Sequence, residues 1–363
     1  MMLDASMHAE KSASWLHRHC PGVLTMLTLP YGLVVQTREK LYEKGWLRES
    51  RLPCPVISVG NLTVGGTGKT PVVIWLARWL RANGKRVGIL SRGYRRTSTA
   101  DCVLVSDGHE CLVSPGDVGD EPFLMAQRCP GAVIAVGSDR YKLGLWVLAR
   151  FDVDCFLLDD GFQHLRLYRD CNLLLIDALD QQGLAALLPR GRLREPLFAA
   201  RRATAILLTR ANQTLQALDT IQPLQSAIGH SVSPIHIAFH TPTLMNIATQ
   251  EVRSSDWLHG KRVVMFSGIG NASSFRRAVE CMGVTIVHEF EFSDHFPYSA
   301  IHVETIYAHA QQHDVDVVLT TEKDGVKVFP LLQGKENIWA ICLETNVEKG
   351  EKDFLELLHR IFE

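Results

Sequence analysis

The sequence predicts an α/β protein with two α/β/α sandwiches, the second smaller than the first. Short apolar runs alternate with helix-length stretches from residue 55 onward, and this rhythm breaks once, over residues 231–255. Buried parallel strands that carry helices on both faces have such continuous apolar runs. The 363 residues also exceed the size at which a single hydrophobic core usually stops growing. We therefore expect two domains joined by a linker.

The expected strands are short apolar runs separated by helical lengths. In the first domain they cover residues 55–59, 86–90, 133–136, 155–158, 172–176 and 204–209. Apolar runs of this length favour buried strands over helices. Residues 235–240 instead alternate apolar and polar positions before a Thr-Pro-Thr triplet, which predicts a β-ribbon. The alternation of strands and helices then resumes, with strands expected at 263–266, 284–287, 315–319 and 338–342.

These elements divide the chain into four expected segments. They are an N-terminal segment 1–40, a first domain 41–230, a β-ribbon linker 231–255 and a C-terminal α/β domain 256–363. The formal net charge of −1 gives no global attraction to nucleic acid, so we expect no nucleic-acid partner. The nine cysteines form no C-x-x-C pair, which favours free thiols in a reducing compartment over disulfides or a zinc site.

The N-terminal segment contains 19 consecutive residues, 19–37, without Lys, Arg, Asp or Glu. A straight helix of that length would reach about 28 Å, just short of a hydrocarbon core of ~30 Å. Pro21 and Pro30 are expected to interrupt the helix and to leave pieces too short to cross. We therefore expect the segment to lie on a membrane surface or to dip into it. A buried N-terminal core helix is the alternative.

A phosphate-binding loop is indicated by the octet TVGGTGKT at residues 63–70, between the first strand and an expected helix. Its glycines allow backbone amides to converge on an anion, and the helix N-terminus adds its dipole. Lys69 offers a charge for the outer phosphates, and Thr70 a hydroxyl for Mg²⁺. The usual G-x-x-x-x-G-K-[ST] spacing has glycine where this chain has Thr63. A glycine-rich turn with an incidental lysine is the alternative to a P-loop NTPase-like nucleotide-binding domain. The expected loop contacts are Thr63, Val64, Gly65, Gly66, Thr67, Gly68, Lys69 and Thr70.

Two acids, Asp159 and Asp160, follow the apolar strand at 155–158. In phosphate-loop proteins an acid at such a strand end approaches the Mg²⁺ of the nucleotide. Together with Lys69 and Thr70, the pair is interpreted as the metal side of the site. Acids that only cap a loop are the alternative.

Other segments combine charge with loop positions, and taken singly each favours a structural role over a functional one. Four such segments, at 91–94, 119–122, 138–140 and 191–196, lie in expected loops or at a helix start. In the second domain, His295 lies between a strand and a helix. Residues 320–324, Thr-Thr-Glu-Lys-Asp, superficially resemble the guanine-reading N-K-x-D motif, but their Lys and Asp are adjacent, so the fit fails.

In this order, the segments resemble the tetraacyldisaccharide 4′-kinase family of lipid A biosynthesis. The resemblance spans roughly residues 20–330, and it accounts for Thr63 because the loop of this family has threonine there. The matching pieces are residues 59–71, 90–94, 118–122, 159–164, 193–196 and 294–296.

The resemblance implies a reaction and a location. The family transfers the γ-phosphate of ATP, with Mg²⁺, to the 4′-hydroxyl of an acylated glucosamine disaccharide 1-phosphate, which gives lipid IVA. Its members work at the cytoplasmic face of the bacterial inner membrane. Such a substrate stays in the bilayer, which gives a reason for the uncharged N-terminal segment.

The resemblance also implies roles for individual residues. Asp120 and His295 match the catalytic pair, with Asp120 as the base. Thr70, Asp159 and Asp160 match the metal contacts. The residues expected to line the substrate cleft are Arg92, Tyr94, Arg140, His164, Arg194 and Glu195.

A nucleotide-driven switch or assembly ATPase is the alternative of a different class. The deviant phosphate loops of that class need a signature lysine where this chain has Val64, and a guanine-reading motif is absent.

Overall fold

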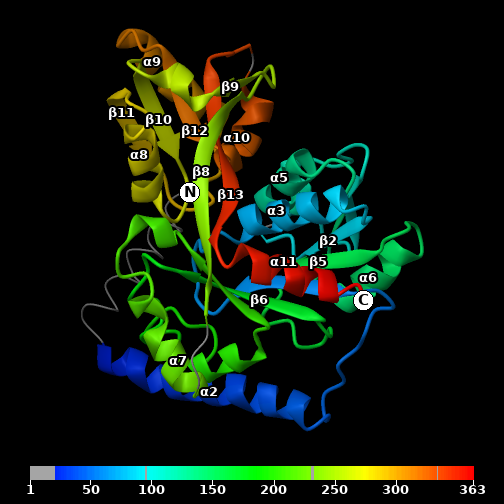
Figure 1. Ribbon diagram of the computed structural model, residues 1–363. Coiled ribbons are helices and arrows are strands. Elements are labelled where there is room, and N and C mark those ends of the chain that lie inside the picture. The colour runs from blue at the N-terminus through cyan, green and yellow to red at the C-terminus, as the bar shows by residue number, and fades with distance from the viewer. Residues whose placement is uncertain (1–20, 95, 230–232, 333) are drawn as a thin grey trace.

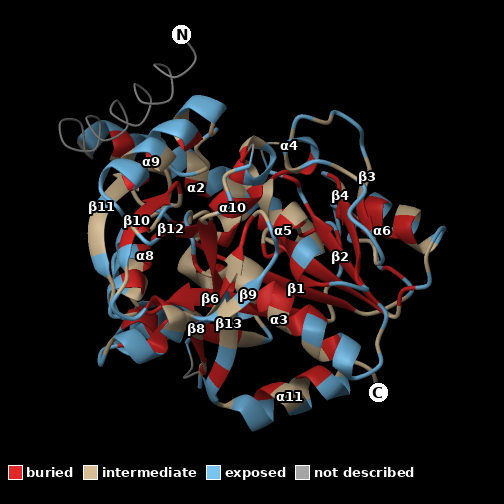
Figure 2. Cartoon of the chain, turned by 90° about the horizontal axis from the view of Figure 1, so that it is seen from above, coloured by how far each residue is buried: buried red, intermediate tan, exposed pale blue. Residues whose placement is uncertain are grey.

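The computed structural model describes residues 21–94, 96–229, 233–332 and 334–363. These residues form an α/β protein around one mixed, largely parallel sheet (Figure 1). The strands follow the order β11-β10-β12-β13-β8-β7-β6-β1-β5-β2-β4-β3, and β9 lies beside β8. The predicted α/β class is therefore confirmed. Figure 2 shows that the buried residues are concentrated in the strands and on the helix faces that cover them.

All six strands predicted for the first half are present. They are β1 (Val56–Asn61), β2 (Val87–Ser91), β4 (Val133–Val136), β5 (Cys155–Asp159), β6 (Cys171–Asp177) and β7 (Ala205–Thr209). The sequence did not predict β3 (Val103–Asp107), an antiparallel edge strand on β4. The helices of this half are α3 (Lys69–Ala82), α4 (Pro115–Val118), α5 (Asp120–Arg128), α6 (Arg140–Leu148) and α7 (Gln222–Ile228), with short 3-10 turns η1 (Leu197–Arg202), η2 (Ala211–Gln213) and η3 (Asp219–Ile221).

The four strands predicted for the second half are also present, and β13 extends seven residues beyond its predicted end at residue 342. They are β10 (Arg262–Ser267), β11 (Thr285–Glu291), β12 (Val317–Thr321) and β13 (Ile338–Lys349). The helices are α8 (Ala272–Glu280), α9 (Ala300–Gln312), α10 (Glu322–Val328) and α11 (Glu351–Arg360), with 3-10 turns η4 (Ser255–Leu258) and η5 (Phe329–Leu331).

Two long strands join the halves. β8 (Ile235–Asn246) pairs in parallel with β7 at its start, and along its length it pairs antiparallel with β13. Only the short strand β9 (Val252–Ser254) gives β8 a partner within the expected linker range. The main ribbon is therefore formed with residues about 100 positions later in the chain, and Figure 1 shows it running between the two halves. The domain boundaries themselves stay a prediction.

The last helix packs against the first half. Trp75 of α3 stacks on Phe354 of α11, with ring centroids 5.6 Å apart. Phe354 and Leu358 belong to the same buried cluster as the residues of β1 and α3. The other half has its own two clusters, one on each face of its strands. Residues 351–360, which the sequence grouped with the C-terminal domain, therefore pack on the first core.

The N-terminal helix α2 (Pro21–Glu43) is continuous, so the expectation that Pro30 interrupts it is wrong. Proline removes one amide donor, which leaves the carbonyl of residue 26 without its helical partner. Met26 and Pro30 lie on an exposed face, where water can bind that carbonyl. Among the described residues, no helix is long and apolar enough to cross a membrane. Residues 1–20 of the expected N-terminal segment lie outside the described residues.

Candidate active site

The phosphate loop connects β1 to α3 and depends on two glycines. Gly65 and Gly68 have φ values of 117° and 83°, a region that other residues rarely adopt. A Cβ at Gly68 would lie 2.3 Å from the Phe239 ring, and one at Gly65 would lie 2.3 Å from the Arg192 guanidinium. The backbone angles favour glycine at both positions, and the Phe239 ring leaves no room for a Cβ at Gly68, whereas the neighbour of Gly65 is the end of a flexible side chain.

Side chains from neighbouring loops bind the carbonyl groups of this loop. Arg192 donates to the carbonyl of Val64 at 2.7 Å, and Arg210 donates to that of Gly66 at 2.8 Å. The hydroxyl of Thr209 donates to the carbonyl of Thr67 at 3.1 Å. These bonds hold the loop through its carbonyl groups, and the amide of Val64 also donates to the carbonyl of Arg192 at 2.8 Å. The remaining amides of such a glycine-rich turn before a helix suit an anion.

Lys69 lies between polar groups at the edge of the sheet. Its ammonium is 3.4 Å from Oδ1 of Asn61 and 3.6 Å from Oδ1 of Asp160. Asn61 also donates to the Thr67 hydroxyl at 2.9 Å, so the strand end and the loop share one hydrogen-bond network. This network holds the ammonium of Lys69 beside the phosphate loop, where it could contact a phosphate.

The two acids at the end of β5 have different environments. Asp159 accepts a hydrogen bond from Ser91 at 3.0 Å, and its other oxygen is buried without a partner. Burial, together with the charges of Glu121 and Asp160, raises the pKa of Asp159 to about 7. Burial also raises the pKa of Asp160, but the charges of Lys69 and Arg194 outweigh this effect and hold it below its usual value.

This arrangement fits the kind of site that Mg²⁺ uses beside a nucleotide. Within the part of the chain that the structure describes, no three His, Cys, Asp or Glu side chains are placed to hold a metal ion. Mg²⁺ at nucleotide sites typically takes one or two protein oxygens together with phosphate oxygens and water. The buried, unpartnered oxygen of Asp159 and the hydroxyl of Thr70, in the first turn of α3, are suitable donors.

Asp120 and His295 are 175 positions apart and lie in contact. Asp120 is the first residue of α5, and His295 follows β11 with a φ of 58°. Nδ1 of His295 is 3.0 Å from Oδ2 of Asp120, and the Tyr94 ring packs edge-on against the imidazole. Burial raises the pKa of Asp120, but the hydrogen bond from His295 and the charge of Lys327 outweigh it and lower the pKa. Asp120 is therefore ionised at neutral pH.

Two lysines of α10 contact this pair, and the sequence analysis did not identify them. Nζ of Lys323 lies 3.0 Å from Oε1 of Glu121 and 3.1 Å from Nε2 of His295. Nζ of Lys327 lies 3.7 Å from Oδ2 of Asp120. In the sequence, residues 320–324 resemble only a guanine-reading motif, and that motif does not fit. The useful signal was two lysines, four residues apart, on a helix that begins at the end of a parallel strand.

The residues expected to line the substrate cleft have mixed surroundings. Arg92 and Tyr94 are exposed in the loop after β2. Arg194 is 2.8 Å from Asp160, at the metal side. Glu195 is buried in an ion pair with Arg202, so its carboxylate has a partner within the protein.

The remaining two expected cleft residues lie near each other. Arg140 is buried at the start of α6, where it donates to the carbonyl of Ser138 at 2.9 Å. Burial and the charge of Arg140 lower the pKa of His164 to about 4. His164 is therefore neutral at pH 7, and its role toward a substrate stays a prediction.

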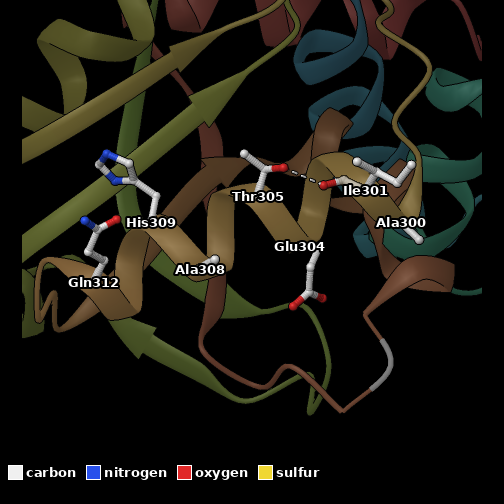
Figure 3. Close-up of a pocket in the computed structure, with 7 residues that line it drawn as sticks. All are labelled: Ala300, Ile301, Glu304, Thr305, Ala308, His309 and Gln312. Carbon is white, nitrogen blue, oxygen red and sulfur yellow. Dashed lines mark hydrogen bonds between the residues drawn. The ribbon is translucent and has the colours of Figure 1, made fainter.

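A surface pocket of about 640 Å³ lies on α9, away from this chemistry (Figure 3). It contains none of the phosphate-loop or Asp120–His295 residues, so we assign no part of the reaction to it. Its lining residues are Ala300, Ile301, Glu304, Thr305, Ala308, His309 and Gln312.

The fold and the loop define a phosphate-loop nucleotide-binding protein. A family model described as tetraacyldisaccharide-1-P 4′-kinase matches residues 21–363. The chain is 38% identical to the tetraacyldisaccharide 4′-kinase of Geobacter metallireducens over 92% of this chain and 96% of that relative. It is 39% identical to the Aquifex aeolicus enzyme of the same name, with the same two coverages. The chain therefore belongs to the tetraacyldisaccharide 4′-kinase family and is an ATP-dependent lipid kinase of lipid A biosynthesis.

A solved structure agrees with this assignment. The crystal structure of the "apo" form of LpxK from Aquifex aeolicus, in complex with ATP, covers 94% of this chain and 99% of that chain. The TM-score is 0.76 at 36% sequence identity. Both the family resemblance and the P-loop NTPase-like fold are thereby confirmed.

The raised pKa of Asp159 predicts a pH dependence of stability in metal-free buffer. An unfolded Asp has a pKa of about 3.9, so between about pH 4 and 7 the folded chain binds more protons than the unfolded chain. The Asp159 contribution therefore lowers the free energy of unfolding as the pH rises through this window, by on the order of 4 kcal/mol at most.

Asp159→Asn should remove this contribution. Urea unfolding should show that the variant gains stability relative to wild type between pH 5 and 7.5, whereas Asp152→Asn, at a largely exposed side chain, should not. An equal stability difference between Asp159→Asn and wild type at both pH values would contradict the buried, protonated Asp159.

Proposed function

We propose that this protein transfers the γ-phosphate of ATP to the 4′-hydroxyl of tetraacyldisaccharide 1-phosphate and so forms lipid IVA. The observation that carries the proposal is the contact between Asp120 and His295 in a chain that also has the phosphate loop of a lipid kinase family. A nucleotide-driven switch or assembly ATPase is the alternative, but it leaves this partly buried acid–imidazole pair without a role.

The nucleotide end of the reaction is assigned to the phosphate loop and to the acids of β5. The amides from Gly65 to Thr70 and the ammonium of Lys69 would bind the phosphates, whereas the amide of Val64 donates to the carbonyl of Arg192 at 2.8 Å. Thr70, Asp159 and Asp160 would hold Mg²⁺ directly or through water, and the ion would neutralise charge on the phosphoryl oxygens. Arg194, which contacts Asp160 at 2.8 Å, keeps that carboxylate oriented toward the loop.

The acceptor end is assigned to Asp120. As an ionised carboxylate it can take the proton of the sugar hydroxyl as the new phosphorus–oxygen bond forms. A pKa below the usual value makes Asp120 a weak base. In a loose phosphoryl-transfer transition state, positioning of the nucleophile contributes more than early proton removal. His295, which is hydrogen-bonded to the carboxylate, fixes the direction in which its free oxygen can point.

Helix α2 would bind the membrane that contains the acylated substrate. The exposed apolar side chains of this helix recur at spacings of three and four residues, so they lie on one face. The opposite face packs on the protein through Leu24 and Gly32. An apolar face without a protein neighbour is suited to the surface of a membrane, here the cytoplasmic face of the inner membrane. These exposed side chains are Val23, Met26, Leu27, Leu29, Leu33 and Val34.

The direct test of the function measures phosphate transfer from labelled ATP to a lipid A precursor and compares it with ATP hydrolysis in the absence of acceptor. We expect transfer to dominate and Lys69→Ala to lose most of it, with the fold intact, because this loop lysine contributes little to the core. Hydrolysis at the same rate without acceptor would favour the switch. Near-normal turnover of Lys69→Ala would overturn the phosphate-loop assignment.

Replacing the base should cost the rate that general-base catalysis supplies. Asp120→Ala is expected to lower turnover ~10²–10⁴-fold, or about 3–5 kcal/mol of transition-state stabilisation. If the two residues act as a unit, Asp120→Ala/His295→Ala should be scarcely slower than the slower single variant. Fully additive losses, with unchanged ATP affinity, would show that the two residues act separately.

Charge on the exposed face of α2 should prevent membrane binding without affecting the nucleotide site. Burying one leucine gains about 1.5–3 kcal/mol, so Leu29→Glu/Leu33→Glu should weaken vesicle binding about 100-fold or more. Co-sedimentation with vesicles of phosphatidylethanolamine and phosphatidylglycerol measures this binding, and ATP affinity should not change.

Val252→Glu/Ile301→Glu is the matched control, because both side chains are exposed and belong to β9 and α9, at the end of the molecule opposite α2 in Figure 1. Equal vesicle binding by wild type and by the α2 variant would show that this face does not contact the membrane.

A further inference from the structure

Four charged or titratable side chains form a closed ring at the junction of α5 and α10. Asp120 contacts Nδ1 of His295, and Nε2 of His295 contacts the ammonium of Lys323 at 3.1 Å. The ammonium also contacts Glu121 at 3.0 Å. Asp120 and Glu121 are consecutive residues at the start of α5, so the ring closes through the backbone.

The chemistry of the lysine determines where the ring proton of His295 lies. An ammonium group has three donors and no acceptor, so Nε2 of His295 must accept from Lys323. In a neutral imidazole the other nitrogen then carries the proton, and Nδ1–H donates to Asp120. The opposite tautomer would place two donors against each other at Nε2 and two acceptors against each other at Nδ1.

The lysine is itself held in place. Its side chain is only 20% exposed, and Glu121 supplies the opposite charge that a cation in such a position needs. Lys327, one helical turn later on α10, lies 3.7 Å from Asp120 and is bound by Asp324 at 2.8 Å. Each lysine of α10 therefore has its own carboxylate partner. At Nε2 of His295, the ammonium of Lys323 lies at 3.1 Å and Oδ1 of Asp294 at 4.0 Å, which is too long for a hydrogen bond.

We propose that Lys323 is a positioning residue that locks His295 in its Nδ1–H tautomer and thereby orients Asp120. The proposal rests on the proposed function, because it assigns a task to Lys323 only if Asp120 acts on the acceptor hydroxyl. A histidine in the wrong tautomer cannot donate to its carboxylate, and in a serine protease triad this error alone lowers kcat by about 10⁴-fold. Lys323 acts through His295 and not on the phosphate.

The tautomer can be read independently of activity. With ¹⁵N-labelled histidine, the ring nitrogen shifts distinguish Nδ1–H from Nε2–H, and the His295 signals are identified by their loss in His295→Asn. Wild type should show the Nδ1–H form. Lys323→Met should show a mixture of tautomers, and Lys323→Arg, which keeps a donor-only cation, should retain Nδ1–H.

Lys335→Met is the matched control, since Lys335 is a comparably covered lysine whose ion pair with Glu304 lies outside the ring. An unchanged tautomer in Lys323→Met would overturn the proposal. If Lys323→Met does not fold, loss of the Nδ1–H form in the folded Lys323→Arg would overturn it equally.

Kinetics separate this role from the alternatives. Lys323→Met should lower kcat about 10- to 100-fold with the KM for ATP unchanged, as expected for loss of one charge-assisted hydrogen bond. In the His295→Asn background the same substitution should cause little further loss, because Lys323 acts through the imidazole. A raised KM for ATP, or an equal loss in both backgrounds, would show that Lys323 contacts the nucleotide and would overturn the proposal.

An error in the proposed function can be distinguished from an error in the role of Lys323. If Asp120→Asn keeps wild-type transfer, the assignment of Asp120 as the base is wrong, whatever Lys323 does. If Asp120→Asn is inactive while Lys323→Met keeps both the wild-type kcat and the tautomer, only the role of Lys323 is wrong.

Discussion

The contact between Asp120 and His295 is the interaction on which the organisation of this site depends. It joins α5, which lies over the first half of the sheet, to the loop after β11 in the second half. The contact does not stand alone, because Arg128 at the far end of α5 forms a buried ion pair with Glu322 at the start of α10. Breaking a buried ion pair from one side leaves an uncompensated charge. The two helices are thus fixed at both ends of α5, and the acid and the imidazole meet in one geometry.

Alternation of charge explains how so many ionisable groups share a small volume. Asp160 lies between Lys69 and Arg194, and its pKa falls below the usual value. Burial, reinforced by the charges of Glu121 and Asp160, outweighs the charge of Lys69 at Asp159, so its pKa rises. A carboxylate that is destabilised in this way gains the most from a divalent cation, because the ion supplies the missing positive charge. The same local field that makes Asp159 costly without metal therefore suits it to a metal-bearing nucleotide.

Local signals were sufficient to predict the phosphate loop, the acids at the end of β5 and the core strands, because each depends on neighbouring residues in the chain. The features that the sequence did not predict depend on residues that are distant in the chain or on solvent. The contacts of Lys323 and Lys327 with residues 120 and 121 arise only when α10 lies beside α5, about 200 positions earlier. Helix α2 continues through Pro30 because solvent reaches that face of the helix. The expectation that proline interrupts a helix takes no account of solvent exposure. The edge strand β3 was missed although residues 102–105 form an apolar run as long as that of β4, because no helix separates β3 from β2 and it pairs antiparallel with β4, outside the strand–helix alternation.

A lipid kinase must contact a membrane and also hold a nucleotide in water, and α2 lies between the surfaces suited to these two tasks. The hydroxyl of Tyr31 donates to the carbonyl of Arg194 at 2.8 Å, and Arg38 donates to the carbonyl of Gln163 at 3.2 Å. Arg194 in turn binds Asp160, one of the two acids at the end of β5. The same helix carries the exposed apolar side chains. A lipid surface bound there would be separated from the nucleotide acids by one helix and one loop, so an acylated sugar could present its hydroxyl without leaving the bilayer.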